Sequence, residues 1–125
     1  MKYLCLIYGE EQWIATLPPR ELNAVGGECA AYGEELKRGG YLLASHRLQS
    51  VETATTVRVR SGKVTVTDGP FAETQEQLGG FYLIDARDLN EAIQLAAKIP
   101  PARFGSVEVR PIDEVLESMG RNPSL

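Results

Sequence analysis

The fold is decided by the stretch Asp68-Gly69-Pro70-Phe71-Ala72-Glu73-Thr74-Gln75-Glu76-Gln77-Leu78-Gly79-Gly80-Phe81-Tyr82-Leu83-Ile84-Asp85. One strand-like run ends at Asp68 and another begins at Gly80, and the segment between them is polar and rich in carboxylates. Asp-Gly-Pro predicts a turn, because Asp bonds to nearby backbone, Gly permits a positive φ, and Pro fixes φ and lacks an N–H donor. We expect this loop to carry function, since loops on a rigid scaffold carry most sites.

The composition indicates a single globular domain of ordinary type. A length of 125 residues is enough for one hydrophobic core. The net charge of −4 and the scattered Lys and Arg residues argue against nucleic-acid binding, which needs a dense basic patch. No apolar run is long enough to span a bilayer, and polar residues 9–12 interrupt the first run too early for a secretory signal. With Cys5 and Cys29 expected as reduced thiols, we predict a cytoplasmic protein that binds no membrane.

Two runs are apolar on both of their alternating faces, Tyr3 to Tyr8 and Phe81 to Ala86. That pattern is typical of strands covered on both sides. Further strands are expected at Tyr41 to Leu48 and at Gly105 to Ile112.

A hairpin is predicted just before the central loop. Ala54 to Arg60 and Lys63 to Thr67 alternate apolar and polar residues, and Ser61-Gly62 between them is a two-residue turn signal. The alternation predicts one covered face and one face in water.

Two helices are expected. The first follows Leu17-Pro18-Pro19 and ends at Gly39-Gly40, with an apolar stripe spaced three and four residues apart: Leu22, Val25, Cys29, Tyr32 and Leu36. Gly26, Gly27 and Gly33 interrupt this helix, which indicates either a close backbone approach or a weak helix. The second helix has Asp88 as its N-cap and ends before Pro100-Pro101.

The remaining segments are irregular or short. A loop is expected over Gly9 to Thr16, and it carries Trp13, the only tryptophan. The C-terminal part, residues 113–125, is predicted to be a short helix over Asp113 to Met119 followed by a frayed tail over Arg121 to Leu125.

Without the hairpin, the predicted elements run βαββαβ, the ferredoxin-like order of an α+β fold. Two helices cover only one face of such a sheet, yet two strands are apolar on both faces. A second copy of the chain, related by a two-fold axis, is the simplest cover for the other face. We therefore predict a homodimer with its sheets face to face.

The central stretch resembles the DGPF family of YCII-related proteins, together with residues 1–8 and the late run from Ala102 to Pro111. The resemblance covers nearly the whole chain, as a single domain over residues 1–125. It implies a dimeric α+β barrel of ferredoxin-like subunits. Such proteins are often encoded beside, or fused to, sigma factors of the extracytoplasmic-function type. In related YCII-like proteins a His on the first helix and an Asp form a proposed catalytic pair, but this helix carries no His.

Candidate site residues lie around the central loop. His46 is the only histidine and titrates near neutral pH, which suits acid–base chemistry, and Asp68 could orient it. The alternatives are an exposed imidazole and a carboxylate that forms its own turn. Candidate ligand-binding residues are Tyr8, Trp13, Phe71 and Glu73. With one His and no paired-Cys, P-loop or dinucleotide motif, we expect no metal and no cofactor.

Two functions follow from these patterns. In the first, a homodimer binds a small organic ligand in a pocket near the loop, with acid–base chemistry by His46 and Asp68. In the second, the protein is a non-catalytic accessory or regulatory protein associated with a sigma factor. A deep cavity that contains Asp68 favours the first, and a filled interior with an exposed apolar patch favours the second.

Overall fold

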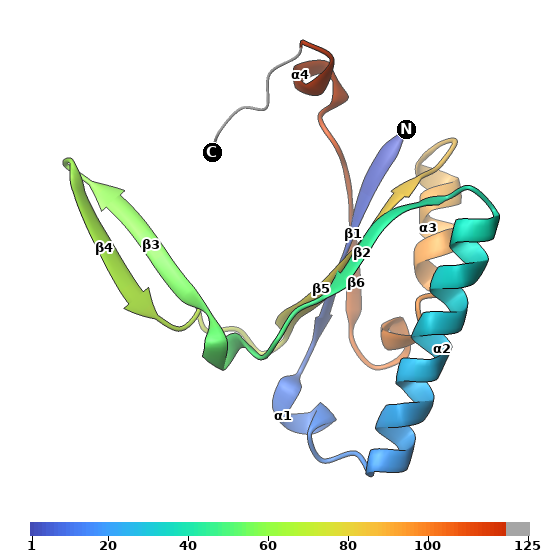
Figure 1. The fold of residues 1–125 in the computed structure, drawn as a ribbon, viewed down its shortest axis with the longest axis horizontal. Coiled ribbons are helices and arrows are strands. Elements are labelled where there is room, and N and C mark those ends of the chain that lie inside the picture. Colours follow the sequence, from blue (N-terminus) through green and yellow to red (C-terminus); the bar gives the residue numbers. More distant parts are fainter. Residues whose placement is uncertain (120–125) are drawn as a thin grey trace.

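The computed structural model describes residues 1–119 and contains a four-stranded antiparallel sheet with two helices on one of its faces (Figure 1). The strands are β1 (Lys2–Gly9), β2 (Leu42–Arg47), β5 (Gln77–Asp85) and β6 (Ser106–Pro111). Their order in the sheet is β2-β5-β1-β6, so the two strands that are apolar on both faces lie at the centre. The predicted α+β fold is confirmed.

The two long helices begin and end where their local sequence predicts. Helix α2 (Pro19–Arg38) has Pro19 in its first turn and ends at Gly39. Helix α3 (Leu89–Ala97) is capped by the Asp88 side chain, which accepts a 2.9 Å hydrogen bond from the Glu91 N–H. Pro100–Arg103 then form a 3₁₀ turn, η2. None of the helices in residues 1–119 has the length and apolar character that a membrane crossing requires.

The core lies between the helices and the inner face of the sheet. Its buried residues are Tyr3, Cys5, Tyr32, Leu36, Tyr82, Ile84, Ala86, Ala92, Ala96 and Ile99. The Tyr32 hydroxyl donates a 2.6 Å hydrogen bond to the Leu95 carbonyl, which ties α2 to α3. Both cysteines are free, and burial raises the pKa of the Cys5 thiol to about 11, so this thiol stays protonated at neutral pH.

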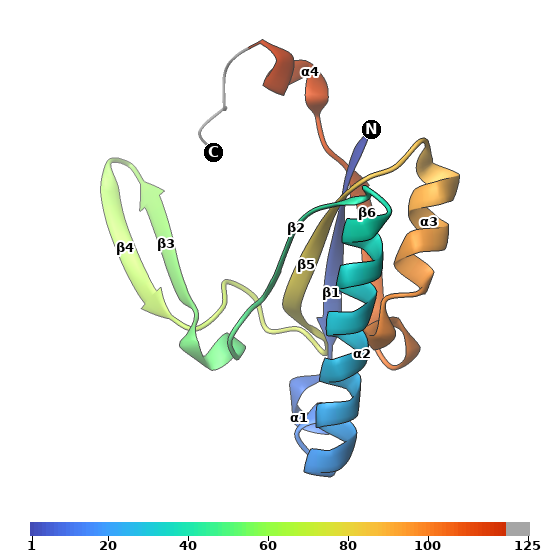
Figure 2. The ribbon, with the colours of Figure 1, turned by 45° about the vertical axis from the view of Figure 1, so that its right-hand side comes forward.

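The other face of the sheet has no helix on it. Figures 1 and 2 show α2 and α3 on the same side. Because side chains alternate along a strand, Leu4 and Leu6 of β1 point away from the helices, as do Phe81 and Leu83 of β5. The register pairs Leu4 with Leu83 and Leu6 with Phe81, so these four half-buried side chains form one apolar patch. We call this patch the open face.

Several segments differ from the sequence-based expectation. The segment from Gly9 to Thr16 was expected to be a loop, but it contains the short helix α1 (Glu11–Ile14). Another 3₁₀ turn, η1 (Val51–Thr53), precedes the hairpin. The predicted C-terminal helix is present as α4 (Glu114–Ser118), whereas the predicted tail over Arg121 to Leu125 lies outside the described residues.

The predicted hairpin is formed by β3 (Thr55–Arg60) and β4 (Lys63–Asp68). Ser61 and Gly62 have φ angles of 51° and 74°, the pair of positive values that a tight hairpin turn requires. The hairpin forms a separate two-stranded sheet that stands away from the rest of the chain (Figure 1). The prediction that one of its faces is covered is therefore wrong for the single chain, since the valines that were expected to be covered are exposed.

The glycines of α2 and β5 serve different purposes. A Cβ added at Gly80 would lie 2.8 Å from the His46 carbonyl oxygen, so β2 and β5 approach each other closely only because this side chain is missing. At Gly26, Gly27 and Gly33 an added Cβ would meet no atom within 4 Å. Within the chain itself, α2 thus makes no close approach at its glycines.

We predict that Gly80→Ala destabilises the fold by about 1–3 kcal/mol, because backbone must move to admit the methyl group. Gly26→Ala is the matched control and should stabilise the protein by about 0.5–1 kcal/mol, since it removes a glycine from an open helix position. Urea unfolding of both variants measures the two changes. A Gly80→Ala variant as stable as the wild type would contradict the close pairing of β2 with β5.

Candidate functional site

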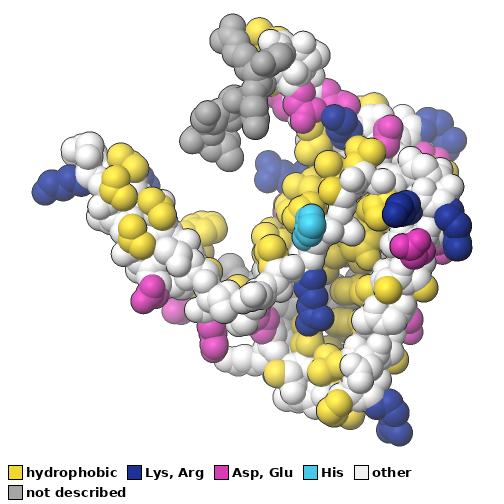
Figure 3. Space-filling view, viewed as in Figure 1, with side chains coloured by type: hydrophobic (Ala, Val, Ile, Leu, Met, Phe, Trp, Pro, Cys, Tyr) yellow, Lys and Arg dark blue, Asp and Glu magenta, His cyan; other side chains and the backbone are white. Residues whose placement is uncertain are grey.

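His46 lies on β2 at the edge of the open face. Its register partner is Phe81, and the two rings lie 5.7 Å apart between centroids at an interplanar angle of 55°. The imidazole is exposed, and Figure 3 shows it, in cyan, at the molecular surface among hydrophobic side chains. The imidazole is therefore open to solvent while its ring lies beside the apolar open face.

Asp68 is the last residue of β4, at the base of the hairpin, and is exposed. The turn after it is held by other groups: the Gly69 N–H donates to the Ala54 carbonyl at 2.7 Å, and the Thr56 hydroxyl donates to the Gly69 carbonyl at 2.8 Å. The φ of Gly69 is 95°, as the Asp-Gly-Pro signal predicts. The backbone path of this loop therefore depends on the glycine and not on the Asp68 carboxylate.

Within residues 1–119, no hydrogen bond or ion pair joins His46 to Asp68. The two residues belong to separate sheets, His46 to the four-stranded sheet and Asp68 to the hairpin. Their pairing as an acid–base couple stays a prediction.

A carboxylate on α1 organises the base of the hairpin. Glu11 accepts hydrogen bonds from the Val51 N–H at 3.0 Å and from the Ser50 hydroxyl at 2.9 Å. Its own N–H donates to the side-chain oxygen of Gln77 at 2.9 Å. One half-buried residue thus joins α1, η1 and the start of β5, and it connects both chain segments that lead into the hairpin. The sequence contained no signal for this network, because its members are far apart in the chain.

A polar hollow of about 330 Å³ surrounds this network, next to the central loop. Its lining comes from α1, η1 and the segment before β5: Glu10, Glu11, Gln12, Val51, Glu52, Thr74, Gln75 and Gln77. Neither His46 nor Asp68 lines it. In residues 1–119, no group of three or more His, Cys, Asp or Glu side chains is placed to hold a metal ion.

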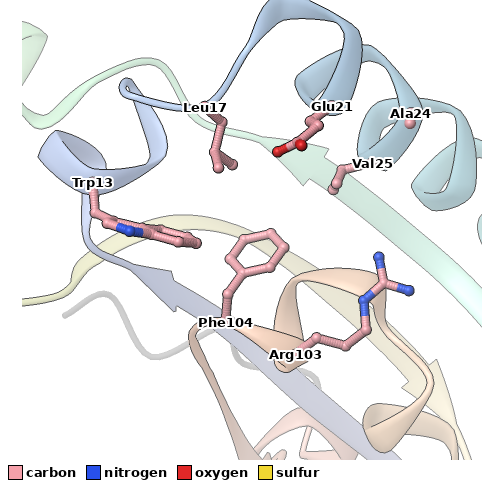
Figure 4. A pocket seen from close by; sticks show the side chains of 7 residues that line it. All are labelled: Trp13, Leu17, Glu21, Ala24, Val25, Arg103 and Phe104. Atoms are coloured by element: carbon pink, nitrogen blue, oxygen red, sulfur yellow. The ribbon is translucent and has the colours of Figure 1, made fainter.

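An apolar pocket of about 300 Å³ lies at the other end of α1, between α2 and η2 (Figure 4). Its lining residues are Trp13, Leu17, Glu21, Ala24, Val25, Arg103 and Phe104. The rings of Trp13 and Phe104 are tilted against each other at 47° with centroids 5.8 Å apart. These two rings form one wall, and Leu17 and Val25 lie across from them (Figure 4). Such a lining suits a molecule with an apolar ring or chain.

The two charged residues of this pocket differ in their partners. Arg103 forms a 2.6 Å ion pair with Glu28, so its charge is already compensated. Glu21 makes no hydrogen bond or ion pair through its side chain with any described residue. Figure 4 shows its carboxylate between Leu17 and Val25, across the pocket from Phe104. The free charge at the pocket is therefore negative.

Of the four residues predicted to bind a ligand, only Trp13 lines either of these two pockets. Trp13 lies in the apolar pocket, whereas Tyr8 is on β1, and Phe71 and Glu73 are exposed in the central loop. Phe71 is 78% exposed. The sequence analysis missed Phe104 as a member of the pocket, because Pro100-Pro101 indicated only where the second helix ends.

The chain is similar to known proteins along nearly its whole length. The family described as the YCII-related domain matches residues 1–116. An uncharacterised protein of Rhizobium meliloti (strain 1021) is 38% identical over 126 aligned residues, which cover 99% of this chain and all of that protein.

Gly69→Ala should destabilise the protein by about 1 kcal/mol or more, because an alanine at a φ of 95° is strained. Thermal unfolding measures this loss. Asp68→Ala is the matched control, and it should leave the melting temperature nearly unchanged because its side chain makes no hydrogen bond within the described residues. An unchanged melting temperature for Gly69→Ala would show that the turn tolerates a side chain there.

Proposed function

The chain belongs to the family of YCII-related domains, and we propose that it acts as a homodimer that binds a small organic molecule. The observation that carries the dimer is the open face. Leu4, Leu6, Phe81 and Leu83 form a contiguous apolar patch that no helix of the same chain covers. If a second copy packs its own open face on this patch, both patches are buried, because a two-fold axis brings identical surfaces together.

The accessible surface of the chain supports this assembly. It measures 9115 Å², whereas a compact monomer of 13.7 kDa exposes about 6,600 Å². One subunit of a permanent homodimer buries roughly 1,000–2,500 Å². The extra surface of this chain is of the size that such an interface removes.

The ligand site that the geometry favours is the apolar pocket and not the polar hollow beside the central loop. Trp13 and Phe104 offer the faces of two aromatic rings, and Glu21 offers a carboxylate without a partner in the described residues. An organic cation with an apolar ring can bind to both the aromatic rings and the carboxylate. Aromatic faces attract cations, and Glu21 supplies the opposite charge. A carboxylate ligand would have to displace Glu28 from Arg103 and approach Glu21.

Leu83→Asp should convert the dimer into a monomer, because it places a charge at the centre of the proposed interface. Leu89→Asp is the matched control: Leu89 is 51% exposed on α3, on the helix side of the sheet, and its variant should stay dimeric. Sedimentation velocity at micromolar concentration distinguishes the two states. A folded, monomeric wild-type protein would contradict the homodimer and favour the accessory function, in which the open face receives a different protein such as a sigma factor.

Trp13 gives a direct test of the ligand proposal, because it is the only tryptophan in the chain. We expect benzylammonium to change its fluorescence saturably and benzoate, the probe of opposite charge, to bind more weakly. Phe104→Ala should weaken the binding of both probes, and Glu21→Gln should weaken benzylammonium alone. Glu34→Gln, on the same helix but outside the pocket, is the control and should change neither. Equal binding of both probes by the wild type would refute the role of Glu21, and binding of neither would refute the pocket.

A further inference from the structure

One face of the β3–β4 hairpin consists of valines. The register pairs Val57 with Val66 and Val59 with Val64, so the four side chains lie together on the same side of the two strands. Their exposed fractions are 59%, 65%, 56% and 66%, respectively. We call this surface the valine face. Figure 3 shows hydrophobic side chains gathered along the hairpin, well apart from the body of the chain.

The opposite face of the hairpin is polar and cationic. It carries Arg58, Arg60 and Lys63 together with threonines of both strands. The hairpin therefore has the pattern of a sheet with one face in water and one face covered. A two-stranded hairpin without such a cover is only marginally stable in water. The covering partner is absent from residues 1–119 of the same chain, because both strands stand clear of the other elements (Figures 1 and 2).

We propose that the valine face packs against a second copy of this chain, so that each hairpin is an arm that holds the partner subunit. This inference rests on the proposed homodimer. The hairpin stands on the side of the sheet away from α2 and α3, the side of the open face (Figures 1 and 2). A subunit that packs on the open face therefore enters the space that the hairpin borders, and the two apolar surfaces together form one continuous interface.

Charge complementarity also favours a second copy over an unrelated occupant. The hairpin has three cationic residues, Arg58, Arg60 and Lys63, and one acid, Asp68. Since the whole chain has a net charge of −4, the remainder of the chain carries −6. A cationic arm is attracted to a second acidic body, which steers the two chains together and fixes their orientation.

The geometry gives this arm a definite base. The Glu11 carboxylate holds η1 through Val51 and Ser50, and Gln77 ties the returning segment to the N–H of the same residue. Both ends of the hairpin are thus anchored to α1, while the valine face stays outside the anchored region. An arm with a fixed base and a free apolar face loses little further freedom when a partner covers it.

The experiment compares Val66→Lys with Thr67→Lys in the full chain. The two residues are neighbours on β4, both are exposed, and their side chains lie on opposite faces of the hairpin. Dilution in sedimentation velocity experiments gives the dissociation constant of each dimer. We expect Val66→Lys to weaken the dimer roughly tenfold or more, and Thr67→Lys to leave it unchanged.

Hydrogen exchange gives a second measurement that needs no substitution. If the arm holds the partner, exchange at the hairpin amides of the wild type should slow as the protein concentration rises through the dimerisation range. Circular dichroism shows whether Val66→Lys folds. If it does not, hydrogen exchange of the wild type still tests the arm.

The outcomes separate the arm from the homodimer itself. A wild-type monomer overturns both proposals. A different set of results overturns the arm but leaves the homodimer intact. In that case the wild type is a dimer that Leu83→Asp breaks, and the Val66→Lys and Thr67→Lys dimers have equal dissociation constants. Exchange at the hairpin amides is then also independent of protein concentration.

Discussion

Two central strands with apolar residues on both faces impose the constraint on which the rest of the structure depends. Tyr3 and Cys5 of β1 are buried under the helices, and Leu4 and Leu6 alternate with them on the opposite face. Two crossover helices can cover only one face, because both connections lie on the same side of the sheet (Figure 2). The helices therefore bury one face of the sheet and leave the apolar side chains of the open face without a helix over them.

The elements that were predictable from the sequence are those whose signals are local. Asp88 with Glu91 marked the start of α3, and Ser61-Gly62 marked the tip of the hairpin, because caps and tight turns are determined by neighbouring residues. The two runs with apolar residues on both faces were correctly expected to be strands, β1 and β5, and the structure adds that they lie at the centre of the sheet. In contrast, α1 was not predicted, since four residues are too few for a helical period to appear in the sequence.

The candidate site was less predictable, since its residues meet only in three dimensions. Trp13 was recognised as a pocket residue from its type, but Phe104 and Glu21 come from two other segments. Alternation in the hairpin predicted a covered valine face without indicating what covers it, and in the single chain nothing does. Alternation along a strand predicts that one face is covered, but it does not indicate which surface provides the cover.

Helix α1 connects the two regions that the proposals concern, the apolar pocket and the hairpin. Glu11 on this helix holds the base of the hairpin, and Trp13, two residues further on, forms a wall of the apolar pocket. Just before the helix, a Cβ added at Gly9 would lie 2.9 Å from the end of the Ile14 side chain, so that side chain would have to shift. The helix is therefore packed closely against its own connection to β1. Glu11 and Trp13 thus belong to one short helix, so the same element positions both the base of the hairpin and one wall of the apolar pocket.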